Sequence, residues 1–349
     1  MKKRLAAVMM TGLMASSVLS GCGSQTVQTE PAPSTQPAET QSVPPTEAQA
    51  ENSEEEKFPK YVFLFIGDGM SYPQIQLTNY FVSASENLNR GTAVVKDEEK
   101  TILDSKNNLA MMDFTVSGSA QTYDSTSFAP DSASTATSIA TGNKTWSGSI
   151  NVSEDFSKEY ETIAEKLKAQ KGYKIGILSS VNLNHATPAA FYAHQASRSS
   201  YYDIGLELIE SGFDYFAGGG LLKPTGSEKN QEDLYTLAEK AGYRVVKTQA
   251  EAEALKPEDG KVIVIDEHLA DSDAMAYELD RTEEQWSLAD YVDKGIAMLD
   301  NENGFFMMVE GGKIDWACHA NDAASTIADT IALDDAVEKA VEFYEEHPE

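Results

Sequence analysis

Ser132 is the residue of this sequence that is best placed to act as a nucleophile. It follows Pro130 and Asp131, and a run of small residues leads from it to Gly142. A proline followed by Asp-Ser and small side chains predicts a loop that enters a helix, with Gly after the last turn. The backbone N–H groups of such a helix end favour an anion, so a serine there could meet a phosphate. Helix capping is the simpler interpretation of an Asp-Ser pair, so the prediction depends on partner residues elsewhere in the chain.

The segment 310–319 carries side chains that suit a metal ion. Asp315 and His319 are four residues apart, so on a helical turn they share one face and could bind one ion. Glu310 follows an apolar run and offers a hard oxygen ligand that suits magnesium. Cys318 lies off that face, and we expect it to pack rather than to bind metal.

Two further segments could complete such a site. Asp68 lies between two glycines after an apolar run, where a carboxylate can approach a cation closely, although a turn aspartate is the alternative. Thr187 has a hydroxyl that could join a magnesium shell, and Arg198 could bind two phosphate oxygens at once. We expect His194 to cap or pack.

Apolar runs alternate with helical periods after residue 58, and this order predicts the elements that position those side chains. Strands are predicted at 61–66, 173–178, 213–216, 243–246, 261–265 and 305–309. Helices are predicted at 161–171, 201–210, 234–241, 251–255, 288–299 and 323–344. Strands that alternate with helices predict an α/β fold, with a mostly parallel sheet covered by helices on both faces. Because chemistry collects at the carboxyl ends of the strands in such sheets, Asp68, His185 and Glu310 should lie along one edge.

The first 57 residues predict export and attachment to a membrane. Basic residues precede an apolar stretch that is too short to span a bilayer, which is typical of a signal peptide at 1–21. The Leu-Ser-Gly-Cys sequence that ends at Cys22 resembles the lipobox of bacterial lipoproteins. It implies lipid attachment to Cys22 at the outer face of the bacterial cell membrane, and an ordinary signal with a chance cysteine is the alternative. Residues 22–57 predict a disordered acidic linker rich in Ser, Thr, Pro and Glu, and 58–349 predict the folded domain.

The composition excludes some classes of function. Asp and Glu outnumber Lys and Arg by 56 to 27, and the net charge of −29 argues against a nucleic-acid-binding protein, which needs a basic surface. Cys22 and Cys318 are the two cysteines, so lipidation of Cys22 would leave no intramolecular disulfide. An exported fold without disulfides must rely on its core and on metal ions.

Four motifs stand in one order along the chain: GDGM at 67–70, PDSASTAT at 130–137, HATPAAFYAH at 185–194 with Arg198 after it, and VEGGKIDWACHA at 309–320. Together they resemble the alkaline phosphatase family, over about residues 58–349. The resemblance implies a three-layer sandwich around a mostly parallel sheet, and hydrolysis of phosphate monoesters through a phosphoserine at Ser132. It also implies that Arg198 holds the phosphoryl oxygens and that a homodimer can form. We expect Asp131 to orient Arg198.

The resemblance further implies a magnesium ion and two zinc ions. Thr187 and Glu310 would bind magnesium, Asp68 would bridge it to one zinc, and Asp315 and His319 would bind the other zinc. His185 and Trp316 stand close to the magnesium site, at positions where family members often have Asp and Lys. This pair leaves the affinity for magnesium and the turnover rate open, but not the reaction.

The zinc sites of the family need ligands beyond those in these 349 residues. A later strand should carry an Asp-His pair and a further histidine should follow, and none of the five histidines fits: His185, His194, His268, His319 and His347. His268 stands ahead of Glu310, in the wrong order, and we expect it at the surface. We therefore expect a C-terminally incomplete catalytic domain at 58–349 that is inactive unless completed. It is either a fragment of a longer protein or a truncated protein that has lost its chemistry.

Two alternative functions stay open at this point. A phosphodiesterase or sulfatase of the same superfamily would use a similar metal site, although Arg198 and three magnesium ligands favour a dianionic monoester. A non-catalytic lipoprotein that captures phosphate or metal would suit the acidic linker and Cys22 equally well, but it would form no covalent phosphoserine.

Overall fold

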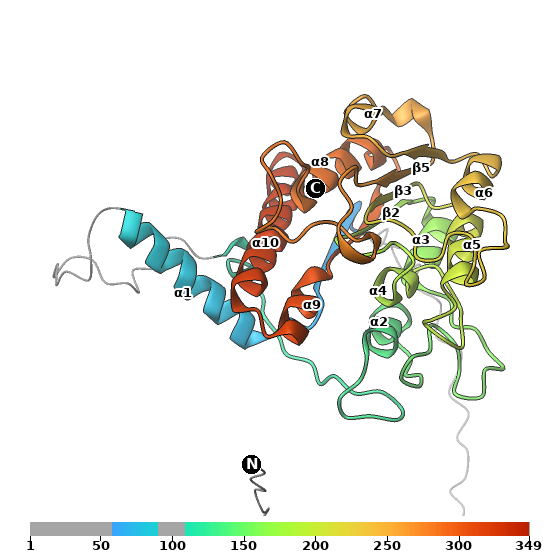
Figure 1. Ribbon diagram of the computed structural model, residues 1–349, viewed down its shortest axis with the longest axis horizontal. Coiled ribbons are helices and arrows are strands. Elements are labelled where there is room, and N and C mark those ends of the chain that lie inside the picture. Colours follow the sequence, from blue (N-terminus) through green and yellow to red (C-terminus); the bar gives the residue numbers. More distant parts are fainter. Residues whose placement is uncertain (1–57, 90–108, 349) are drawn as a thin grey trace, which may run out of the picture. The chain divides into compact units, whose positions relative to one another are not determined.

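The computed structural model describes residues 58–89 and 109–348 (Figure 1). The chain divides into two units, residues 1–56 and 57–349, and the described residues all belong to the second. The predicted signal peptide, Cys22 and the linker up to residue 57 lie outside the described residues. None of the helices in 58–89 and 109–348 combines the length and the apolar character needed to cross a membrane.

A parallel sheet forms the centre of the described unit. Its six strands are β1 (Tyr61–Gly67), β2 (Lys174–Ser179), β3 (Tyr215–Gly218), β4 (Arg244–Val246), β5 (Val262–Ile265) and β6 (Phe305–Gly311). Their order is β1-β6-β2-β3-β5-β4, and every pair of neighbours is parallel. The predicted α/β class and the parallel sheet are confirmed.

Helices cover both faces of this sheet (Figure 1). They are α1 (Tyr72–Asn89), α2 (Ser132–Thr141), α3 (Ile163–Lys171), α4 (Ala186–Ala189), α5 (Tyr201–Ser211), α6 (Leu234–Lys240), α7 (Gln249–Glu253), α8 (Leu288–Leu299), α9 (Lys313–Ala320) and α10 (Ala323–Glu346). One core cluster joins the sheet to helices α2 to α6, through residues such as Ala136 and Ile204. The other joins it to α8 and α10, through residues such as Val292 and Leu333.

The sequence of strand β6 is a continuous apolar run because its side chains are buried on both faces of the sheet. Phe306 and Met308 belong to the first core cluster, whereas Phe305, Met307 and Val309 belong to the second. Successive side chains of a strand point to opposite faces, and here both faces are buried. No solvent-facing position therefore interrupts the apolar pattern.

Helix α1 and strand β3 differ from the prediction, and the short helix α4 is not predicted by the sequence either. The sequence does not predict α1, because its side chains form no clear apolar stripe: Tyr72 and Phe81 are exposed, whereas the polar Thr78 is buried. Strand β3 begins and ends two residues later than predicted, from Tyr215, which pairs with Gly176 of β2, to Gly218, which pairs with Ser179.

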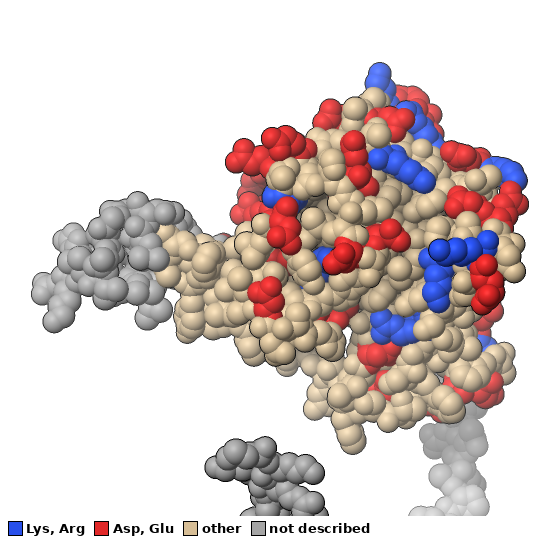
Figure 2. All heavy atoms as spheres, viewed as in Figure 1, with Lys and Arg blue, Asp and Glu red and all other residues tan. Residues whose placement is uncertain are grey.

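The edge of the sheet at β1 is apolar and only partly covered. All seven β1 residues are partly exposed, and β6 is the neighbour of β1 among the described strands. Few charged side chains cover α1 and the loop that leads into α2 (Figure 2).

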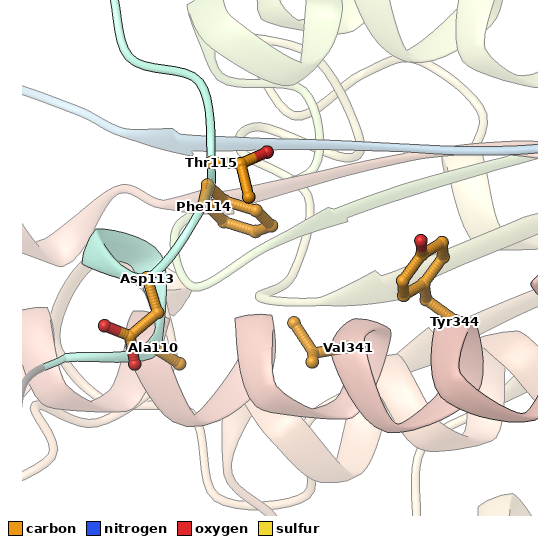
Figure 3. Close-up of a pocket in the computed structure, with 6 residues that line it drawn as sticks. All are labelled: Ala110, Asp113, Phe114, Thr115, Val341 and Tyr344. Atoms are coloured by element: carbon orange, nitrogen blue, oxygen red, sulfur yellow. The ribbon is translucent and has the colours of Figure 1, made fainter.

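A pocket of about 470 Å³ lies beside α10, and no residue predicted for catalysis lines it (Figure 3). Its lining consists of Ala110, Asp113, Phe114, Thr115, Val341 and Tyr344.

Asp329 of α10 is a buried carboxyl whose ionisation opposes folding. It is 7% exposed, and its Oδ2 accepts a hydrogen bond of 3.4 Å from the backbone N–H of Glu278. Burial raises the pKa of Asp329 to about 7, and the Glu278 hydrogen bond and the charge of Lys313 offset only part of this rise. The folded chain therefore keeps a proton on Asp329 between about pH 4 and pH 7, where the unfolded chain does not. The free energy of unfolding consequently falls as the pH rises through this window.

The substitution Asp329→Asn should remove this part of the pH dependence. Three pKa units correspond to about 4 kcal/mol, so the unfolding free energy of the variant should rise relative to wild type by roughly 2–4 kcal/mol between pH 4 and pH 8. Urea denaturation at several pH values measures the difference, with Asp293→Asn at an exposed position of α8 as the control. Parallel stability curves for Asp329→Asn and wild type would contradict the prediction.

Candidate active site

The predicted site residues come together where β1, β6 and β2 end. Gly67 of β1 pairs with Gly311 of β6, so Asp68 follows β1 beside the end of β6. Glu310 pairs with Ser179, the last residue of β2. The carboxyl ends of these three strands thus place Asp68 and Glu310 along one edge of the sheet, as the sequence predicts.

Ser132 is the first residue of α2 and faces Asp68. Its hydroxyl donates to Asp68 Oδ2 at 3.0 Å, and Oδ1 lies at 3.3 Å. Asp131, rather than Ser132, caps the helix, because its side chain accepts a hydrogen bond of 3.1 Å from the N–H of Ser134. The Ser132 hydroxyl is therefore free of the capping role and is directed at the carboxylate across the site.

Arg198 is held between Asp131 and His185. One guanidinium nitrogen donates to Asp131 Oδ2 at 2.8 Å, and the other lies 3.4 Å from His185 Nε2. Burial, with the nearby Arg198 charge, lowers the pKa of His185 to about 4, so this imidazole is neutral at neutral pH. His185 Nε2 can then accept a hydrogen bond from the guanidinium.

Glu310 is fully buried and its charge is poorly balanced. Burial raises its pKa to about 8, and the charge of Asp68 adds to this rise. Hydrogen bonds from the hydroxyls of Ser179 and Thr187 act in the opposite direction, as does the charge of Arg198. Glu310 Oε1 has no hydrogen-bond partner within the described residues.

Asp68 carries the second unbalanced charge of the site. Burial is the main cause that raises its pKa, followed by the charge of Asp315, whereas Ser132 and Arg198 lower it. Gly69 allows Asp315 to approach this turn, because its φ is +65° and a Cβ there would lie 2.7 Å from Asp315 Oδ1. The Asp315 carboxylate therefore lies close to the turn that carries Asp68.

Asp315 and His319 lie on one face of α9, as their spacing predicts. His319 Nε2 is 3.5 Å from Asp315 Oδ1, and the His319 side chain is 81% exposed. Trp316, on the same helix, packs edge-on against the His185 ring, with the ring centroids 6.2 Å apart. Cys318 packs beside the second core cluster, and its Sγ accepts a hydrogen bond from Gln74.

The other histidines lie away from this cluster. His194 contacts the backbone oxygen of Tyr160 at 3.2 Å and Glu165 at 3.6 Å, which agrees with the expected packing role. His268 is exposed, as the sequence predicts.

The donor atoms of the site suit divalent cations. Asp68, Glu310 and Thr187 offer two carboxylates and a hydroxyl, and hard oxygen ligands of this kind suit magnesium. The raised pKa values of both carboxyls and the unpartnered Glu310 Oε1 are what a missing positive charge would produce. Within 58–89 and 109–348, however, no three His, Cys, Asp or Glu side chains converge on one point. Asp315 and His319 thus stand as a pair, without a third such side chain beside them in this part of the chain.

Two residues at the site were not predicted from the sequence. Ser179 hydrogen-bonds Glu310, and its place at the end of an apolar strand is a signal that could have identified it. Gly69 permits the approach of Asp315, but this role depends on a contact across 246 residues and leaves no local signal.

Comparisons with known proteins agree with the motifs. The family model for alkaline phosphatase matches residues 59–349. Alkaline phosphatase 3 of Bacillus subtilis strain 168 is 30% identical over 311 residues, which cover 86% of this chain and 61% of that protein. The alkaline phosphatase of Escherichia coli K12 is 31% identical over 262 residues, 62% of this chain and 55% of that protein.

Solved structures show the same likeness. The cold-active alkaline phosphatase from the psychrophile Shewanella sp. has a TM-score of 0.67 and 27% identity, covering 83% of this chain and 65% of that one. The alkaline phosphatase from the Antarctic bacterium TAB5 has a TM-score of 0.65 and 27% identity, covering 82% of this chain and 75% of that one. A mutant of the TAB5 enzyme with a histidine changed to glutamate has Mg bound in its M3 site.

The chain spans 45–61% of the length of the first three curated relatives that it matches. The match nevertheless extends over nearly all of the described residues. Its fold, the order of its motifs and the arrangement of Ser132, Asp68 and Arg198 lead to one conclusion: this chain belongs to the alkaline phosphatase family.

Proposed function

We propose that this protein hydrolyses phosphate monoesters through a covalent phosphoserine at Ser132, with the help of bound zinc and magnesium. The observation that carries the proposal is the position of the Ser132 hydroxyl. It lies in the first turn of α2, 3.0 Å from Asp68 Oδ2, beside a guanidinium that Asp131 holds at 2.8 Å. A nucleophile, a helix N-terminus and an arginine thus point at the same volume.

The chain's own residues account for binding and orientation of the phosphoryl group. Arg198 can hold two of its equatorial oxygens, and the free N–H groups at the start of α2 favour the same negative charge. Asp68 accepts the Ser132 hydrogen bond, which leaves the lone pairs of Oγ available for attack on phosphorus. Attack by Oγ forms the Oγ–P bond as the bond to the leaving oxygen breaks, and the serine proton ends on the departing alcohol. Water later attacks phosphorus and breaks the Oγ–P bond, which returns a proton to Oγ and releases inorganic phosphate.

The metal ions would add charge that the protein does not supply. Thr187, Glu310 and Asp68 would hold magnesium, Asp68 would also hold one zinc, and Asp315 and His319 would hold the other zinc. When bound, such ions lower the pKa of a coordinated hydroxyl and stabilise the leaving oxygen. The neutral His185 beside Trp316 brings no negative charge to the magnesium site, so we expect weaker magnesium binding than with a carboxylate at that position.

Ser132→Ala should abolish the phosphoenzyme. In the protein isolated from its native cells, acid quenching with p-nitrophenyl phosphate should trap one phosphoryl group on the peptide that contains Ser132, detected by mass spectrometry. The variant should lose the adduct and at least about a thousandfold in kcat. Ser138→Ala on the same helix is the matched control, because the Ser138 hydroxyl bonds only the backbone oxygen of Ser134. Stoichiometric phosphate binding without the adduct would instead favour a binding lipoprotein.

We also propose that turnover needs zinc ligands beyond those of these 349 residues. The described residues provide Asp315 and His319 for one zinc and Asp68 for the other. Purified residues 23–349 with added zinc and magnesium should bind inorganic phosphate but should not turn over p-nitrophenyl phosphate. Measurable hydrolysis by this polypeptide that Ser132→Ala abolishes would contradict this proposal, without affecting the role of Ser132.

We further propose that the protein is exported and lipid-anchored through Cys22. The support is the sequence alone: a short apolar signal followed by Leu-Ser-Gly-Cys. Radioactive palmitate should label the protein in a bacterial host, and Cys22→Ala should lose the label. Equal labelling of both would contradict the anchor.

A further inference from the structure

Asp124 is a buried carboxylate at the centre of a hydrogen-bond network. It is 5% exposed and lies in the loop before α2. Its Oδ1 accepts hydrogen bonds from the N–H groups of Thr126 and Ser127 at 2.7 and 2.6 Å, and from the Thr126 hydroxyl at 2.9 Å. Its Oδ2 accepts from the hydroxyls of Ser134 at 2.9 Å and Ser147. Burial disfavours this charge, but the hydrogen bonds outweigh burial and lower the pKa of Asp124 to about 2.

The two segments that Asp124 joins are the ones that hold Asp131. Asp131 Oδ1 accepts hydrogen bonds from the N–H of Ser134 at 3.1 Å and from the N–H of Gly148 at 2.9 Å. Ser134 belongs to α2, whereas Gly148 follows Ser147 in a separate loop. Asp124 therefore connects, through hydrogen bonds from Ser134 and Ser147, the two segments whose N–H groups bind the Asp131 carboxylate.

The Ser134 hydroxyl links the two carboxylates directly. Its oxygen lies 2.9 Å from Asp124 Oδ2 and 2.8 Å from Asp131 Oδ1. A hydroxyl has one hydrogen to donate, so the two carboxylates compete for it. Neutralising Asp124 changes how much of this donor Asp131 receives, and so changes the acceptor strength that Asp131 offers to Arg198.

Arg198 depends on the same loop through its backbone. Its N–H donates to the oxygen of Gly148 at 2.7 Å, while its guanidinium donates to Asp131 Oδ2 at 2.8 Å. The backbone of Arg198 is thus held by the loop of Gly148, and its guanidinium by Asp131. Asp124 hydrogen-bonds Ser147 of this loop and shares the Ser134 hydroxyl with Asp131. A guanidinium that binds two phosphoryl oxygens requires a fixed plane, because both N–H···O bonds must be aligned together.

We propose that Asp124 is a positioning residue that fixes the direction of the Arg198 guanidinium through Ser134, Ser147 and Asp131. The proposal rests on the proposed function, in which Arg198 holds the phosphoryl group. Asp124 itself does not touch the phosphoryl group. It acts on Arg198 through Ser134 and Asp131 and takes no part in making or breaking bonds.

The test compares inorganic phosphate binding by the full chain and by Asp124→Asn, measured by calorimetry with zinc and magnesium present. Asp124→Asn should weaken phosphate binding about tenfold, because a misaligned guanidinium loses one of two charged hydrogen bonds. Asp155→Asn is the matched control. Asp155 also accepts hydrogen bonds from neighbouring Ser hydroxyls, at 2.7 Å from Ser153 and from Ser157, but among the described residues it does not bond to Asp131 or Arg198. The Asp155→Asn variant should therefore bind phosphate with wild-type affinity.

A double-mutant cycle separates positioning from general support of the fold. If Asp124 acts through Arg198, Asp124→Asn should change phosphate binding less than about twofold in an Arg198→Ala background. An equal loss in both backgrounds would overturn the proposal, as would wild-type affinity in a folded Asp124→Asn. If Asp124→Asn does not fold, Ser134→Ala removes the shared hydroxyl but keeps the Thr126 and Ser127 bonds. Ser134→Ala should weaken phosphate binding in the wild-type background and much less in the Arg198→Ala background. Equal losses of affinity in the two backgrounds would overturn the proposal.

Hydrogen exchange gives a readout that needs no ligand. The amides of Ser134 and Gly148, which donate to Asp131, should exchange faster in Asp124→Asn than in wild type, and unchanged exchange would overturn the proposal. Should the wild-type chain fail to bind phosphate, that result would contradict the proposed role of Arg198, and exchange at these two amides would still decide the role of Asp124.

Discussion

Repulsion between the buried Glu310 carboxylate and the partly buried Asp68 carboxylate at the sheet edge is the constraint on which the rest of the site depends. The charge of Asp68 raises the pKa of Glu310, and the charge of Asp315 raises the pKa of Asp68. Removing one such charge from water costs several kcal/mol even after the protein relaxes. Arg198 is the cation whose charge reaches both Asp68 and Glu310, and it is shared with Asp131. An arrangement with this excess of negative charge is understandable when cations bind to it.

The parallel sheet is what brings these charges together. Strands β1, β6 and β2 are adjacent and run in one direction, so the residues after their last pairs meet at one edge. The apolar side chains of β6 anchor it in both core clusters and leave Glu310 little freedom to move. The folding free energy gained in the two cores therefore offsets the electrostatic cost at the edge.

The sequence predicts the parts of the fold whose signals are local. The four inner strands, β6, β2, β3 and β5, were predictable because both of their faces are buried, which produces uninterrupted apolar runs such as FFMMV in β6. Asp315 and His319 were predictable as a pair because four residues are about one helical turn. Ser132, Arg198 and Asp68 were predictable through motif resemblance, and the structure places Ser132 against Asp68 and Arg198 against Asp131.

The features that the sequence does not reveal depend on tertiary contacts. The burial of Asp124 arises because helix α2 brings Ser134, and a separate loop brings Ser147, to the same carboxylate. In the sequence, Asp124 followed by Ser and Thr reads as an ordinary turn. Helix α1 similarly carries no clear periodic pattern, because it packs against α10 along part of its length and exposes aromatic side chains elsewhere.

At the start of α2, Asp131 caps the helix, and this leaves the hydroxyl of Ser132 free to act as a nucleophile. A serine at a helix start usually satisfies a backbone N–H, and its hydroxyl is then occupied. Here Asp131 provides that hydrogen bond to Ser134 with one carboxylate oxygen and binds Arg198 with the other. Ser132 is one residue further, where its hydroxyl turns toward Asp68 instead of the helix. A single aspartate thus both releases the serine from capping and holds the arginine beside it, so replacing Asp131 would disturb the nucleophile and the phosphate-binding cation at once.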